Sequence, residues 1–248
     1  KLEDNGSSIG VEVIDLGAEG DTITGFAKLE VGVDTDDSGS NTFDSKLAYV
    51  GLDSNMGALS VGRQSHPFTD NIGGKTSIFN VYGGGSDWNY ASRSSNSLKF
   101  STTQSGLTLD TIGIVDGSSS NTNAFDEFEV TISTQLLGSD VSVGYADDVN
   151  SDISYWGIAG STDLGPLTVG SSYTIYDAAT DKYGLEATAS YSIFSVGYGD
   201  KEGTGVSYTA GVSHDLNKSV SVYAEGEMKD LDSGSDTTSW SIGSKFTF

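Results

Sequence analysis

The chain has 248 residues, of which 12 are basic and 35 acidic, so its formal net charge at pH 7 is −23. Such a chain repels nucleic-acid phosphates, which argues against DNA or RNA as a partner. It contains no cysteine, and this excludes disulfide scaffolds, thiolate zinc sites and thiol catalysis. No run of 18 apolar residues occurs, which excludes a transmembrane helix but leaves a transmembrane β-barrel open, because barrel strands alternate polar and apolar residues.

Alternation with a period of two is the dominant pattern of the sequence. In residues 22–34, Leu29 and Val31 share one face whereas Lys28 and Glu30 share the other. Successive side chains of a strand point to opposite faces, so each such segment has an apolar and a polar face. The pattern recurs to the end of the chain and predicts an all-β fold. The fifteen predicted strands, in chain order, cover residues 8–16, 22–34, 44–53, 57–64, 96–102, 106–115, 126–136, 139–147, 153–162, 165–176, 182–191, 193–200, 205–214, 218–229 and 238–248.

The connections between these strands alternate between short and long. Residues 55–56 and 104–105 form short turns, whereas residues 65–95 and 115–125 form long connections. This alternation is typical of an outer-membrane barrel, which has short periplasmic turns and longer outer loops. A soluble β-sandwich should carry many Lys and Glu residues on its polar faces, which here are mostly Ser, Thr and Gly, and a β-solenoid should show a fixed repeat. We therefore predict one domain, residues 1–248, forming a closed antiparallel transmembrane barrel.

Closure of this barrel calls for an even number of strands, since both termini then lie on the periplasmic side. Counting back from Phe248 places the start of the strand 8–16 on the outer side. An open edge would present unpaired backbone groups to lipid. We therefore expect a sixteen-stranded barrel whose first strand is missing from this sequence, and no pairing between residues 8–16 and 238–248.

Several stretches resemble the Gram-negative general porins. They are Ser8–Gly10, Asp15–Gly17, Lys46–Leu52, Met56–Gln64, Asn96–Phe100 and Lys245–Phe248. The resemblance implies a homotrimer in the outer membrane, in contact with the lipid bilayer and lipopolysaccharide. It implies a water-filled channel for passive diffusion of ions and small hydrophilic solutes, with no cofactor, no metal and no catalytic residues. The aromatic residues Phe246 and Phe248 would form the assembly signal.

The longest connection, residues 65–95, stands where the third outer loop of that family folds inward and narrows the pore. Its aromatic content exceeds that of a disordered loop. In the family, an arginine of a Gly-Arg motif faces carboxylates on this loop. The resemblance thus assigns the pore constriction to Arg63, Arg93, Asp70, Asp87 and Lys75. Simple alternation puts Arg63 on the apolar face of its strand, so the assignment requires either a bulge or a subunit interface there.

Charged residues on the polar faces are expected to line the lumen. These residues are Glu12, Lys28, Glu30, Glu127, Glu129, Glu186, Glu225, Glu227, Lys229 and Lys245. Seven of them are acids and three are bases, which predicts a mild cation preference. The two histidines, His66 and His214, lack any ligand spacing and are expected to be ordinary surface residues.

Two other functions are compatible with the same scaffold. A channel selective for sugars or peptides would need an aromatic track along the lumen, for which the inward candidates are Phe26, Tyr49, Trp156, Tyr176 and Tyr223. A structural or adhesive surface barrel would need a plugged lumen, and such a lumen tends to hold denser salt networks. Enzymatic activity is not expected, because no nucleophile, base or metal constellation is assembled.

Overall fold

The computed structural model describes residues 3–18, 20–36, 41–86, 91–115, 125–149, 151–177 and 180–248. Within them, fifteen strands form one antiparallel sheet in which each strand pairs with its neighbours in the sequence. The strands are β1 (Ser8–Leu16), β2 (Ile23–Val33), β3 (Phe43–Ser54), β4 (Gly57–Ser65), β5 (Arg93–Gln104), β6 (Leu107–Ile114), β7 (Glu127–Leu136), β8 (Ser139–Asp148), β9 (Ile153–Leu164), β10 (Leu167–Asp177), β11 (Lys182–Tyr191), β12 (Phe194–Lys201), β13 (Gly205–Asn217), β14 (Val220–Leu231) and β15 (Thr237–Phe246). The all-β prediction and its fifteen strands are confirmed.

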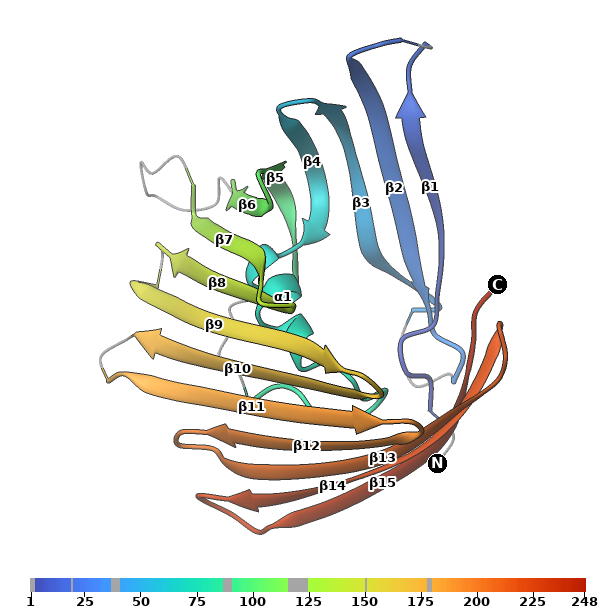
Figure 1. Ribbon diagram of the computed structural model, residues 1–248, viewed down its shortest axis with the longest axis vertical. Coiled ribbons are helices and arrows are strands. Elements are labelled where there is room, and N and C mark those ends of the chain that lie inside the picture. Colours follow the sequence, from blue (N-terminus) through green and yellow to red (C-terminus); the bar gives the residue numbers. More distant parts are fainter. Residues whose placement is uncertain are drawn as a thin grey trace.

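Helical structure in the described ranges is limited to α1 (Pro67–Asn71) and the 3-10 turn η1 (Gly73–Lys75). Both belong to the long connection between β4 and β5. Figure 1 shows a strongly curved sheet with α1 on its concave side. None of the helices in the described parts has the length and apolar character needed to cross a membrane.

The two ends of the sheet are the strands β1 and β15. β1 pairs with β2 and β15 pairs with β14, and no ladder joins β1 to β15 in the described residues. The expected lack of pairing between residues 8–16 and 238–248 is therefore confirmed. Closure of the sheet by a sixteenth strand stays a prediction.

The two faces of the sheet differ in polarity, as the period-two pattern predicts. On β7, Glu129 and Thr131 point to the concave side and are 2% and 1% exposed, whereas Phe128 and Ile132 on the other side are exposed. The convex face carries exposed apolar side chains along the sheet. A surface of this kind is too apolar for water and suits a lipid environment.

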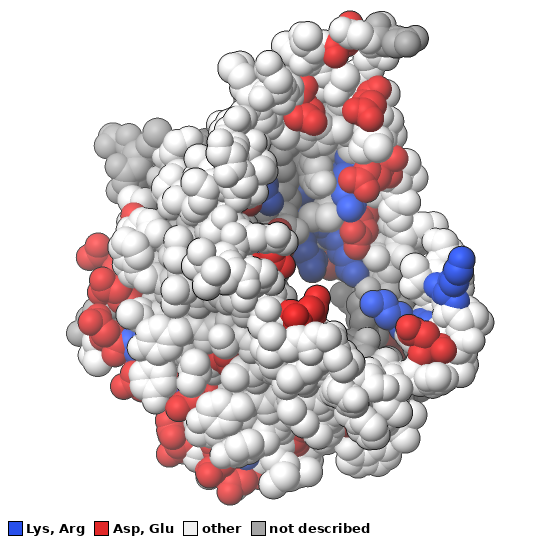
Figure 2. All heavy atoms as spheres, viewed as in Figure 1, with Lys and Arg blue, Asp and Glu red and all other residues white. Residues whose placement is uncertain are grey.

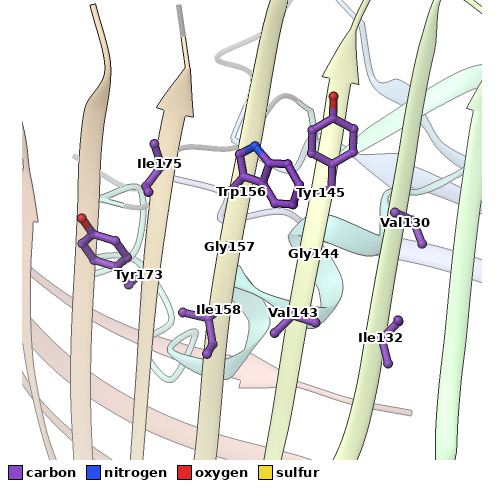
Figure 3. A pocket seen from close by; sticks show the side chains of 10 residues that line it. All are labelled: Val130, Ile132, Val143, Gly144, Tyr145, Trp156, Gly157, Ile158, Tyr173 and Ile175. Atoms are coloured by element: carbon purple, nitrogen blue, oxygen red, sulfur yellow. The ribbon is translucent and has the colours of Figure 1, made fainter.

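The prediction that Trp156 points into the lumen is wrong. Tyr155, its neighbour on β9, is 7% exposed and occupies the inner position, so Trp156 must point to the convex face, where it is 54% exposed. There its ring lies 4.5 Å from the ring of Tyr145 on β8, measured between centroids. Figure 3 shows these two rings on the near side of the strands and α1 behind them. They border a shallow apolar groove of about 390 Å³ across β7–β10.

A small apolar cluster lies on the concave side beneath α1. Phe68 and Ile72 are fully buried there against Ala146, Tyr155 and Ala159. The inner wall is thus polar over most of its area, with an apolar contact beneath α1. Burial of two large side chains contributes about 1.5–3 kcal/mol each, which attaches α1 to the sheet.

Gly157 makes this close approach possible. A Cβ atom at Gly157 would lie 2.8 Å from Cζ of Phe68, closer than such contacts occur in real structures. The same crowding would arise at Gly170, where a Cβ atom would lie 2.1 Å from the carbonyl oxygen of Lys75. Both glycines lie on strands that the long connection crosses, so their lack of a side chain leaves room for it.

Replacing Gly157 by Val should destabilise the protein by about 1–3 kcal/mol, the usual penalty for overpacking. The free energy of unfolding can be measured in urea on protein refolded in detergent. Gly226→Val is the matched control, because a Cβ atom there meets nothing closer than 3.6 Å. Equal unfolding midpoints for the two variants would contradict this account of the packing.

Candidate functional site

Residues 66–86, called the crossing segment below, run along the concave face from one side of the sheet toward the other. Helix α1 contacts β6, β7 and β8, and η1 contacts β9 and β10. Farther along, Phe79 lies close to Gly197 on β12 and Gly211 on β13. The crossing segment therefore spans the inner side of nine consecutive strands, from β6 to β14, where its next contacts lie.

Glu129 on β7 binds the beginning of the crossing segment. One of its carboxylate oxygens lies 2.6 Å from Nδ1 of His66, and the other accepts a hydrogen bond of 3.0 Å from the backbone N–H of Phe68. Glu129 is 2% exposed and His66 is fully buried. Buried carboxylates need such partners, because an unpaired charge away from water is very unfavourable.

Glu225 on β14 binds the middle of the crossing segment with both carboxylate oxygens. Oε1 accepts hydrogen bonds from the backbone and side-chain N–H groups of Asn80, at 2.7 and 2.9 Å. Oε2 accepts from the backbone N–H groups of Val81 and Tyr82, at 2.8 and 3.3 Å. Hydrogen bonds to charged groups contribute about 1.5–3 kcal/mol each, so this carboxylate is a strong attachment point.

Two further glutamates complete the attachment. Glu186 on β11 accepts hydrogen bonds from the hydroxyl of Thr76 at 2.7 Å and from the N–H of Ser86 at 2.8 Å. Glu227 on β14 accepts a longer bond of 3.4 Å from the N–H of Gly83. The carboxylates that the sequence assigns to the lumen wall thus serve as acceptors for backbone N–H groups.

The prediction that His66 is an ordinary surface residue is wrong. His66 is fully buried, because the crossing segment folds back onto the sheet and brings the imidazole against Glu129. Its partner is 63 positions away in the sequence, so no local spacing could have indicated the contact. His214 on β13 is exposed, as expected.

Asp70 on α1 is paired with Lys99 on β5, at 3.8 Å between Oδ2 and Nζ. Lys99 also donates a hydrogen bond of 3.1 Å to the carbonyl oxygen of Ser65. The Asp70 side chain is 49% exposed, and its partial desolvation raises the pKa of Asp70 above its usual value, while the attraction of Lys99 acts in the opposite direction. Asn71 adds hydrogen bonds of 3.0 Å to Asp110 and 2.7 Å to Thr131. Sequence reasoning missed Lys99 and Asp110, whose relation to the crossing segment depends on tertiary structure.

Arg63 lies at a bulge in the ladder between β4 and β5. The register shifts between Gly62 and Gln64, and the φ angle of Gly62 is 133°. The extra residue of this bulge lies on β5, whereas the ladder with β3 runs regularly to the pair of Arg63 with Ala48, so Arg63 keeps the face of Val61. Its assignment to the constriction stays a prediction. The Arg63 guanidinium donates hydrogen bonds to the carbonyl oxygen of Ser45 at 3.2 Å and to the hydroxyl of Ser95 at 3.4 Å. In the described contacts, Asp70 pairs with Lys99, and Arg63 bonds to the neighbouring strands.

The other three residues that were predicted for the constriction are Arg93, Lys75 and Asp87. Arg93 is the exposed first residue of β5, paired with Ser65 across the ladder. Lys75 ends η1 and is half-buried, with its carbonyl against β10. Asp87 lies outside the described residues.

The concave face of the first strands carries paired charges of both signs. Lys28 lies 3.7 Å from Glu12, and Lys46 lies 3.9 Å from Glu30. Lys46, which the sequence reasoning did not include, also donates a hydrogen bond of 2.6 Å to the carbonyl oxygen of Gly6. Figure 2 shows basic and acidic side chains gathered inside the hollow of the molecule.

The remaining predicted wall and assembly residues lie at the ends of β7 and β15. Glu127 is half-buried at the start of β7. Lys245 and Phe246 are exposed at the end of β15, and Phe248 is exposed at the end of the chain.

A curved β-meander with an apolar outer face and a charged, polar inner face is the architecture of an outer-membrane β-barrel. Residues 3–234 match the family model described as Gram-negative porin, so the chain belongs to the Gram-negative porin family. A comparison of the sequence with curated proteins finds no match.

Solved porin structures have the same fold. OmpF of Salmonella typhi, in complex with daunomycin, aligns at 16% identity with a TM-score of 0.77, over 96% of this chain and 89% of that chain. OmpT of Vibrio cholerae in its trimer form aligns at 17% identity with a TM-score of 0.75, over 99% and 92%. A multiple mutant of the Rh. blastica porin aligns at 18% identity with a TM-score of 0.65, over 97% and 89%.

Replacing Glu225 by Gln should loosen the middle of the crossing segment, because a neutral amide offers one acceptor oxygen in place of two charged ones. We expect the amide hydrogens of Asn80, Val81 and Tyr82 to exchange with solvent about tenfold faster or more. Hydrogen exchange followed by mass spectrometry or NMR measures this. The control is Glu12→Gln on β1, which should leave these amides unchanged. Unchanged exchange in the Glu225 variant would contradict the proposed attachment.

The replacement Asp70→Asn tests the charge environment of α1 through the pH dependence of the free energy of unfolding. A raised pKa means that the folded protein favours the neutral carboxyl, so the ionised group destabilises the fold above this pKa and stops doing so as the pH falls through it. We expect the variant to be more stable than the parent at neutral pH. This difference should shrink as the pH approaches the usual aspartate value of 3.8.

Asp4→Asn provides a comparison of opposite sign. A hydrogen bond from the Ser7 side chain is the main cause that lowers the pKa of Asp4. Its stabilising contribution is therefore present above the usual aspartate pKa and is lost as the pH falls through the lowered value. This variant should be less stable than the parent at neutral pH, with a difference that disappears in acid. The free energies of unfolding of both variants can be measured in urea at neutral pH. If both variants were more stable than the parent, or both less stable, the opposite pKa shifts of Asp70 and Asp4 would be refuted.

Proposed function

We propose that the protein is an outer-membrane channel for passive diffusion of ions and small hydrophilic solutes, in which the crossing segment narrows the pore. The observation that carries the proposal is the attachment of residues 66–86 to glutamates on β7, β11 and β14 across a polar concave face. A segment held at several points along a hollow interior reduces its cross-section without filling it. The size limit for solutes then depends on this segment.

We further propose a mild cation preference. Glu129, Glu186 and Glu225 are 2%, 3% and 6% exposed, and N–H groups of the crossing segment offset part of their charge. The better exposed inner carboxylates pair with lysines, as in Asp70 with Lys99. The interior charges therefore partly balance, and the excess of acids over the whole chain, 35 against 12, favours cations only weakly.

The proposed assembly is a homotrimer in a lipid bilayer, with lipopolysaccharide at the outer leaflet. The relative from Vibrio cholerae has a trimer form. The edge strands present exposed apolar side chains suited to lipid or a subunit contact, including Ile9 and Val11 on β1 and Trp240 and Ile242 on β15. The aromatic track that a sugar- or peptide-selective channel needs is interrupted, since Trp156 points outward.

The selectivity is tested by the reversal potential of the reconstituted protein in planar bilayers under a salt gradient. We expect a potential of cationic sign that decreases as salt screens the inner charges. Lys99→Gln should increase the cation preference and Asp70→Asn should decrease it, because each removes one charge of a pair inside the hollow. A parent protein with a reversal potential of anionic sign would contradict the proposal.

A further inference from the structure

A small hollow, separate from the large interior of the sheet, lies at the end of the crossing segment. There the segment meets the end of β12, the start of β13 and the end of β14, beside the turn formed by residues 202–204. The volume of the hollow is about 80 Å³, and the residues that carry its chemistry are Gly85, Ser86, Lys201, Thr204, Ser207 and Lys229. A buried water needs only about 10–15 Å³ of such space, so the hollow accommodates several waters or one compact anion.

Two lysines border this hollow from neighbouring parts of the sheet. Lys229 on β14 pairs with Ser207 on β13, and Lys201 on β12 pairs with Gly205 on β13. Because Gly205 and Ser207 are two residues apart on β13, the two lysine side chains lie on the same face of the sheet, at the rim of the hollow. Lys201 donates a hydrogen bond of 3.1 Å to the carbonyl oxygen of Gly85, which fixes its ammonium group beside the crossing segment. Two basic side chains at one small hollow are notable in a chain with 12 basic and 35 acidic residues.

Lys229 on β14 contributes the second ammonium group of the hollow. Lys229 lies 2.9 Å from Glu227, and its side chain is 45% exposed. An ammonium group has three donors, of which this ion pair uses one. Glu227 also accepts a bond from the N–H of Gly83, so its charge is shared between two donors.

Hydroxyl groups supply the neutral donors of the hollow. The hydroxyl oxygens of Ser86 and Ser207 lie 3.5 Å apart. Ser86 reaches the wall because Gly199 has no side chain there, since a Cβ atom at Gly199 would lie 2.1 Å from the Ser86 hydroxyl. Thr204 also lines the hollow.

We infer that this hollow is a binding subsite for a compact oxyanion, such as inorganic phosphate or the phosphate, sulfate or carboxylate group of a solute. Ammonium groups bind phosphate as point charges, and hydroxyl donors complete the coordination of its oxygens. The inference rests on the proposed channel, because the subsite would hold an anionic group on its way along the pore. A pore that weakly prefers cations would thereby contain a local binding site for anions.

Isothermal titration of inorganic phosphate into the protein refolded in detergent tests the subsite without requiring a current. We expect saturable binding, with sulfate competing and chloride at equal ionic strength failing to compete. Lys201→Gln and Lys229→Gln should each weaken binding about tenfold, the size expected for a charge-assisted hydrogen bond. Lys245→Gln is the matched control, since this exposed lysine pairs with Ser221 at the other end of the sheet and should have no effect.

Absence of saturable phosphate binding, or equal binding by the parent and both lysine variants, would overturn the inference. Single-channel currents separate this failure from that of the proposed function. A protein that conducts ions but does not bind phosphate leaves the channel intact and removes the subsite. A protein that binds phosphate through Lys201 and Lys229 but forms no channel keeps the subsite and refutes the channel.

Discussion

The structure depends on carboxylates of the inner wall that accept hydrogen bonds from the backbone of one long connection. Glu129, Glu186 and Glu225 are buried, and each binds N–H groups of residues 66–86. Neither partner is stable alone at this position, because a buried carboxylate requires donors and a buried irregular backbone requires acceptors. Their mutual satisfaction fixes the crossing segment against the wall and thereby shapes the interior.

This constraint explains two further features of the inner face. Glycines lie where the crossing segment comes closest, as at Gly157 beneath Phe68, because any side chain would occupy the space that the segment needs. The carboxylates on the wall also lose part of their influence on ions, since N–H dipoles surround them. In the proposed channel, the electric field along the pore would then depend more on the paired charges of the first strands and α1, such as Asp70 with Lys99.

Alternation along the sequence predicts all fifteen strands, because a strand with one polar and one apolar face imposes a period of two on its own residues. It also places Glu225 on the polar face, where the structure has it. The contacts of the site could not be predicted in this way. His66 meets Glu129 across 63 positions, and Lys99 meets Asp70 from another strand, so these pairs exist only in the folded sheet. The face of Trp156 was predicted wrongly, since both it and Tyr155 are large aromatics and the alternation of β9 does not distinguish them.

The central claim, that the wall carboxylates hold the crossing segment in one position, is tested most directly by a distance measurement. The chain has no cysteine, so Val81→Cys and Met228→Cys introduce two unique sites for spin labels, one on the crossing segment and one on the convex side of β14. Pulsed electron spin resonance should give one narrow distance distribution, which broadens when Glu225 is also replaced by Gln. A broad distribution while Glu225 is still present would contradict the account.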